Sequence, residues 1–191
     1  MAVTAAQNQT LVAILWPAGD KILFRNLVLV ILGTLLLALS ASVRVPFHPV
    51  PMTLQSLLVL LLGASYGWRL GGLTILAYLA TGAAGLPVFS SGQGLDYMMG
   101  PPGGYLLGFL VAAIIVGALA ERGFDRKIVS SLIMFGIGEA LILACGVGYL
   151  ASMIGGQKAL LVGLVPFIPG DALKLGLAAA LMHFIWRKVK T

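Results

Sequence analysis

The sequence predicts an all-α membrane protein with six transmembrane helices and both termini in the cytoplasm. Its 191 residues are 60% hydrophobic and only 9% charged, and the mean hydropathy is +1.05. Charged residues make up roughly a quarter of an ordinary soluble domain, so this composition excludes that class. The apolar residues are also gathered into stretches long enough to span a bilayer, with the basic residues between them.

The first 25 residues are predicted to form a cytoplasmic N-terminal segment. They contain one short apolar run, Leu11 to Trp16, with no basic region before it, so a cleaved signal peptide is not expected. A short amphipathic helix on the membrane surface fits this run. Residues 26–191 are predicted to form a single six-helix transmembrane domain.

Six stretches are long enough to be transmembrane helices, because a crossing needs about 17 to 25 mostly apolar residues at about 1.5 Å per residue. The connections contain helix-breaking residues, as in "RVPFHPVP" after the first stretch and "PFIPG" before the sixth. We therefore interpret the connections as loops of one domain. The six predicted helices are residues 26–43, 52–68, 70–86, 104–121, 128–154 and 171–187.

The basic residues indicate the orientation. Arg44 and Lys158 lie on one side of the predicted membrane, and nine of the 12 Lys and Arg lie on the other. Those nine are Lys21, Arg25, Arg69, Arg122, Arg126, Lys127, Arg187, Lys188 and Lys190. By the positive-inside rule both termini are cytoplasmic, and the Pro- and Gly-rich loops face outward, where we expect a binding site. The basic residues form no stripe with interleaved aromatics, so no nucleic acid partner is expected.

Two charged residues interrupt the apolar pattern at the start of the sixth helix, in "PFIPGDALKL". The prolines and the glycine before Asp171 predict that this residue lies at or next to the N-cap, and a simple capping role is the alternative to a functional one. Lys174 follows one turn later on the same face, where a lone cation opposes the helix dipole and is costly inside a membrane. We favour a functional pair over a structural ion pair. An Asp acceptor beside a Lys donor suits a urea or an amide, and the Lys also suits a carboxylate.

Neutral polar groups and aromatic rings are expected to complete this site. Thr53 and Gln55, in "PVPMTLQ", either bind the ligand or cap the second helix. Phe89 and Phe167 are candidate apolar walls, with burial in the core as the alternative for each.

The loop "SSGQGLDYMMGPPGGY" carries two further candidates, Gln93 and Tyr105. Its glycines and its length predict a flexible lid over a small molecule, with an ordinary long loop as the alternative.

Glu139, in "FGIGEALIL", is the other costly residue, either protonated and bonded to a neighbour or a carrier of protons. We expect it at the membrane midplane and His183 near the inner side, both far from Asp171 and Lys174, which argues against an intramembrane enzyme. Walker A, HExxH and GxSxG motifs are absent, and the single Cys145 offers no metal-ligand spacing. No catalytic residue, metal or cofactor is therefore expected.

Four strings in the chain together resemble the BioY family, the biotin-specific S components of energy-coupling factor (ECF) transporters. They are "PVPMTLQ", "GLPVFSSGQG", "GPPGGYLLGF" and "PFIPGDALK", and the resemblance runs from about residue 27 to the C-terminus. It implies an S-component fold in a prokaryotic cell membrane that binds biotin from outside with high affinity. It also implies delivery through a transmembrane coupling protein and two ATPase subunits.

The resemblance also assigns residues. In the family, the Asp and Lys of the "PGDxxK" string contact biotin, and they match Asp171 and Lys174; a polar residue of the glycine-rich loop matches Gln93, although this chain reads "SGQGL" where members often read GG-x-GG. Biotin has a ureido ring with two N–H donors and one carbonyl, and a tail that ends in a carboxylate. Asp171 therefore suits the N–H groups, and Lys174 suits the carbonyl or the carboxylate.

On the first helix, S components tend to show small residues four apart where they meet the coupling protein. Thr34, Ala38 and Ser42 fit this spacing, although the usual pair of alanines is absent. Three alternatives stay open: an S component for another small vitamin, an intramembrane enzyme that uses Asp171 and Lys174, and a helical scaffold without a ligand.

Overall fold

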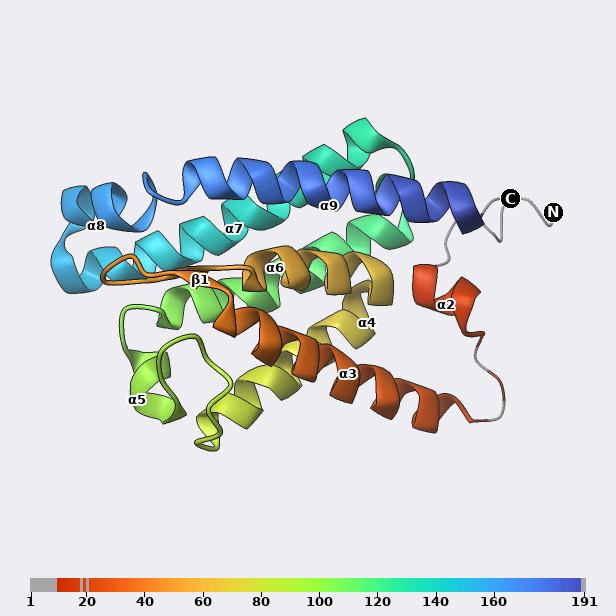
Figure 1. Ribbon diagram of the computed structural model, residues 1–191, viewed down its shortest axis with the longest axis horizontal. Helices are drawn as coiled ribbons and strands as arrows, with labels where there is room; N and C mark the ends of the chain where they lie inside the picture. Colours follow the sequence, from red (N-terminus) through yellow and green to blue (C-terminus); the bar gives the residue numbers. More distant parts are fainter. Residues whose placement is uncertain (1–9, 18, 20, 190–191) are drawn as a thin grey trace.

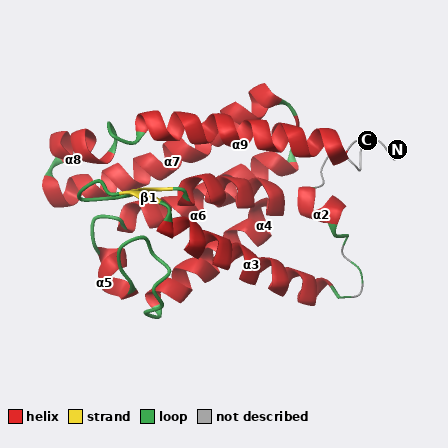
Figure 2. Cartoon of the chain, viewed as in Figure 1, coloured by secondary structure: helices red, strands yellow, loops and turns green. Residues whose placement is uncertain are grey.

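The computed structural model describes residues 10–17, 19 and 21–189 and consists mainly of helices (Figure 2). Residues 1–9 of the predicted N-terminal segment and Lys190 of the charge pattern lie outside the described residues.

The helices are long where the sequence is continuously apolar. Five of those in the described part of the chain, α3, α4, α6, α7 and α9, are long and apolar enough to cross a membrane. In chain order the elements are α2 (Leu11–Leu15), α3 (Ile22–Ser42), β1 (Arg44–Val45), β2 (Met52–Thr53), α4 (Gln55–Ala83), α5 (Gly94–Met99), α6 (Gly103–Glu121), the 3-10 helix η2 (Phe124–Arg126), α7 (Ile128–Ile154), α8 (Gly156–Gly163) and α9 (Ile168–Val189). The two short strands pair antiparallel, with Arg44 opposite Thr53.

The long element α4 folds back on itself at Gly67, whose backbone has φ 82° and ψ 174°. A Cβ atom at Gly71 would lie 3.1 Å from the Cα of Gly63. Those two residues would be about 12 Å apart along a straight helix. The two halves of α4 therefore lie side by side, with the turn at Gly67 (Figure 1). Gly67 is next to the predicted break between the second and third spans.

The two ends of the bundle differ in structure. Figure 1 shows α2, η2 and the last turns of α9 at one end, and β1, α5 and α8 at the other. The first end has the loop with Arg122 and Lys127, which the charge pattern assigns to the cytoplasm. At the second end, α5 and α8 are short helices within stretches that are predicted to be loops. Arg44 of β1 donates a hydrogen bond to the carbonyl of Ser90, which ties the ribbon to the loop before α5.

The N-terminal segment packs more closely against the bundle than predicted. Leu11 of α2 is buried in the core, while Leu15 and Trp16 are exposed. The helix α3 begins at Ile22, so the predicted boundary after residue 25 falls one turn inside it. A short helix is present, as predicted, but one side of it covers protein.

The prediction that Asp171 lies at or next to the N-cap is wrong, because α9 begins at Ile168 and Asp171 lies within its first turn. Pro169 is tolerated there because the first N–H groups of a helix have no partner within it.

A buried carboxyl fastens the opposite end of α9. Trp186 donates from Nε1 to Oδ2 of Asp125 at 2.7 Å, and the guanidinium of Arg126 lies 4.8 Å from the centroid of the Trp186 ring. Burial raises the pKa of Asp125 to about 6, against smaller opposing effects of the Trp186 hydrogen bond and the Arg126 charge.

Candidate functional site

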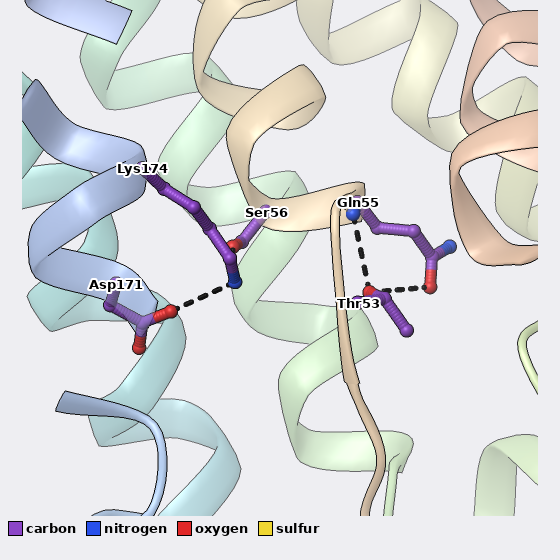
Figure 3. Close-up of polar contacts among 5 residues, drawn as sticks. All are labelled: Thr53, Gln55, Ser56, Asp171 and Lys174. Atoms are coloured by element: carbon purple, nitrogen blue, oxygen red, sulfur yellow. Dashed lines mark hydrogen bonds and ion pairs between the residues drawn. The ribbon is translucent and has the colours of Figure 1, made fainter. Parts of the chain in front are cut away.

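Asp171 and Lys174 form a buried ion pair on the first turns of α9. Lys174 Nζ lies 2.9 Å from Asp171 Oδ1, and the two residues are 8% and 4% exposed, respectively. Lys174 also donates at 3.1 Å to Oγ of Ser56, which lies in the first turn of α4 (Figure 3). Ser56 is not among the residues predicted from the sequence, although it directly follows the string "PVPMTLQ". A buried pair with an additional hydrogen bond loses less by desolvation than a pair alone.

The pair belongs to the wall of a cavity formed by α4, α6, α7, α9 and the outer loops. The cavity has about 480 Å³ of space between atoms, which includes open solvent at its mouth, and a volume of about 40 Å³ that admits the centre of a water molecule. Its lining includes the polar residues Thr53, Gln55, Ser56, Glu139, Asp171 and Lys174 and the aromatic residues Tyr97, Tyr105, Phe109 and Phe167. Apolar walls with a few convergent polar groups are typical of small-molecule sites.

Thr53 and Gln55 are brought to this cavity at the start of α4. Thr53 Oγ1 accepts from the backbone N–H of Gln55 at 3.2 Å and donates to Oε1 of the same residue at 3.2 Å (Figure 3). The Gln55 amide donates in turn to the hydroxyl of Tyr78. Thr53 therefore does help to cap the helix, as the alternative interpretation had it, and both residues still line the cavity.

Tyr105 and Phe167 form one aromatic wall. Their rings stack with centroids 5.8 Å apart, and the Tyr105 hydroxyl donates to the carbonyl of Gly163 at 2.7 Å. The prediction that Tyr105 is part of a flexible lid is wrong, because it lies in the first turn of α6 and is buried.

Two predicted site residues, both within the described part of the chain, do not line the cavity. Gln93 is exposed just before α5. Phe89 is buried, edge-on to Tyr78 and stacked on Tyr97 with centroids 5.2 Å apart. From the same segment, Ser90 and Tyr97 line the cavity instead, which a local pattern does not reveal.

Glu139 contradicts the expectation that it lies far from the ion pair. Its side chain is 4% exposed, lines the same cavity, and lies against Asp171, Lys174 and Ser56. The reason is the position of α8, which lies beside the outer end of α7, so that α9 begins level with the middle of α7 (Figure 1).

The predicted docking residues on α3 do not all face outward. Ser42 is exposed, but Thr34 and Ala38 are half-buried, and Ala38 packs against the core. The exposed side chains of α3 are instead mostly apolar and include those of Leu27 and Leu39.

Comparisons with known proteins agree on one family. The profile of the BioY family matches residues 8–191. The chain is 33% identical over 165 residues to the probable biotin transporter BioY of Rickettsia prowazekii, with 84% of this chain and 82% of the relative covered. It is 37% identical over 159 residues to the biotin transporter BioY of Thermotoga maritima, with 81% and 92% covered.

A crystal structure of the S-component for biotin from an ECF-type ABC transporter is similar in fold. The TM-score is 0.78 over 89% of this chain and 95% of that chain, at 24% identity. The fold is therefore that of an S component.

Proposed function

This chain belongs to the BioY family, and we propose that it captures biotin at the outer face of a prokaryotic cell membrane for uptake. The observation that carries the proposal is the buried Lys174–Asp171 pair, which faces a cavity lined by further polar groups and by aromatic rings. Buried charges that are not needed for folding are costly inside a membrane and usually mark a ligand path.

The chemistry of the cavity suits biotin. Asp171 offers an acceptor oxygen for a ureido N–H group, and Lys174 offers a donor for the ureido carbonyl or the tail carboxylate. Thr53 and Gln55 supply neutral hydrogen bonds, and Tyr105 and Phe167 supply flat apolar surface for the rings.

Binding requires the outer loops to move. The space of about 40 Å³ that admits water is far too small for a bicyclic vitamin. Displacement of the segment between α4 and α5 opens the cavity and gives Gln93 and Phe89, which now lie outside it, a route to the ligand.

The chain crosses the membrane six times in this proposal, with both halves of α4 counted and both termini in the cytoplasm. The fold-back at Gly67 and the grouping of basic residues support this orientation. Because the sequence has no Walker A motif, energy for uptake is supplied by partners, which we take to be a transmembrane coupling protein and two ATPase subunits. Thr34, Ala38 and Ser42 of α3 are the proposed contact.

Native mass spectrometry of the detergent-purified protein tests the function. One unmodified biotin per chain is the expected result, and binding of labelled biotin should saturate at the same ratio. Another vitamin at one to one would replace biotin as the ligand. A converted product would indicate an enzyme, and no ligand in either experiment would indicate a scaffold.

A further inference from the structure

Glu139 is a buried acid in an otherwise apolar part of α7. It is 4% exposed, and its neighbours in the cavity wall include Asp171, Lys174 and Ser56. A carboxyl group at this depth costs free energy unless it is hydrogen-bonded or neutralised. The fold nevertheless places it at the cavity, where two carboxyl groups face one ammonium group.

The hydrogen bonds within this cluster do not use all of its acceptor oxygens. Lys174 donates to Asp171 Oδ1 and to Ser56 Oγ, which uses two of its three N–H donors. Among the described residues, Asp171 Oδ2 and Glu139 Oε2 are buried without a hydrogen-bond partner. Glu139 also lies within hydrogen-bonding range of Asp171 and Ser56, so a ligand with two N–H donors would replace the contact between the two carboxyl groups and take up their acceptor oxygens and the remaining ammonium donor.

We propose that Glu139 is a third ligand-binding residue, which accepts a hydrogen bond from one N–H group of a cyclic urea while Asp171 accepts from the other. This inference rests on the proposed function. A cyclic urea carries two N–H donors on either side of one carbonyl acceptor, and the remaining Lys174 donor matches that carbonyl. The cluster thus selects the ureido ring, whereas Asp171 alone would accept from one side of it.

The first test measures biotin affinity by calorimetry on the purified protein. Glu139→Leu removes the acceptor at similar volume and should weaken binding by roughly ten- to a hundredfold. Glu139→Gln keeps a carbonyl oxygen and should lose less. Glu121→Gln is the matched control, because Glu121 bonds to the backbone of Trp68 outside this cavity, and it should bind like the parent. Parent-like affinity in Glu139→Leu overturns the inference but leaves the proposed function intact.

The second test uses biotin methylated at one or the other ureido nitrogen. Each methyl group removes one N–H donor and should weaken binding to the parent. In Glu139→Leu, methylation at the nitrogen that faces position 139 should cost little more, while methylation at the other nitrogen keeps its full cost. Equal losses in parent and variant for both analogues overturn the assignment. If Glu139→Leu does not fold, the same comparison is made with Glu139→Gln. A parent that binds no biotin overturns the proposed function itself.

Discussion

The side-chain amide of Gln55 donates a hydrogen bond to the hydroxyl of Tyr78, although the two residues lie 23 positions apart in one element, α4. A straight helix would separate them by about 35 Å. Tyr78 also donates to the carbonyl of Val88 at 3.0 Å. This hydroxyl therefore joins three parts of the chain: the start of α4, its second half and the segment before α5.

Tyr78→Phe should destabilise the protein and weaken ligand binding. The variant leaves the Gln55 amide and the Val88 carbonyl without their partner, which costs about 1 to 3 kcal/mol. Gln55 also lines the cavity, so its displacement should lower biotin affinity. Thermal unfolding and calorimetry measure the two effects. Tyr66→Phe is the control, because its hydroxyl bonds to Leu29 away from the cavity, and it should leave affinity unchanged.

Gly67→Ala should destabilise the fold. The φ of 82° and ψ of 174° at this position belong to a region that is essentially open to glycine alone, and a Cβ atom would also lie 2.9 Å from Thr10 Cγ2 and against Glu121. We expect a loss of about 1 to 3 kcal/mol in thermal unfolding. Gly176 lies on the exposed side of α9 with open space around it, so Gly176→Ala should leave the free energy of unfolding unchanged or increase it. Equal stability of the two variants would contradict the role given to Gly67.

Asp171→Asn and Lys174→Met should each weaken biotin binding by at least roughly tenfold. Each change removes a charged hydrogen bond and leaves the other member of the buried pair uncompensated. Lys158→Met, in exposed α8, is the control and should bind normally. Folded variants of the pair that bind as tightly as the parent would make the pair structural.

The methyl ester of biotin identifies the ligand group that Lys174 holds. If Lys174 donates to the ureido carbonyl, Lys174→Met should lose affinity for the acid and the ester alike. If it holds the carboxylate, the loss should be confined to the free acid. The measured quantity is the ratio of dissociation constants for the two ligands in parent and variant.

The topology predicts which positions are reachable from outside the cell. In a variant without Cys145, single cysteines at Ser91 and Gln157, both exposed, should react with an impermeant reagent in intact cells. A cysteine at exposed Lys127 should react only after lysis. The reverse pattern would invert the orientation.

The protein should become less stable as the pH rises toward the pKa of Asp125. Because burial holds its pKa at about 6, above the ordinary value of 3.8, the folded state binds more protons than the unfolded state between these values. The free energy of unfolding should therefore decrease between about pH 4 and pH 6, by at most about 1.4 kcal/mol per unit. Asp125→Asn keeps an acceptor for Trp186 and should flatten this dependence in thermal unfolding. Parallel curves for parent and variant would contradict the assignment.

Features that depend on neighbouring residues could be predicted from the sequence alone. The span predicted at 128–154 coincides with α7, and the break beside Gly67 was visible, because bilayer-length apolar runs and the residues that interrupt them are local properties. The closeness of Asp171 and Lys174 was predictable for the same reason, since residues three apart lie on one helix face.

Contacts between residues far apart in the sequence became known from the folded structure. Ser56 reaches Lys174 from 118 positions away, and Glu139 joins the cavity because α9 begins level with the middle of α7. Gln93 and Phe89 are residue types that are common in binding sites. Phe89 nevertheless packs against Tyr78 and Tyr97 in the core, and Gln93 lies at the surface. Helical periodicity fixes the face on which a side chain lies but not the depth at which two helices are aligned, because loops and intervening short helices such as α8 set that depth.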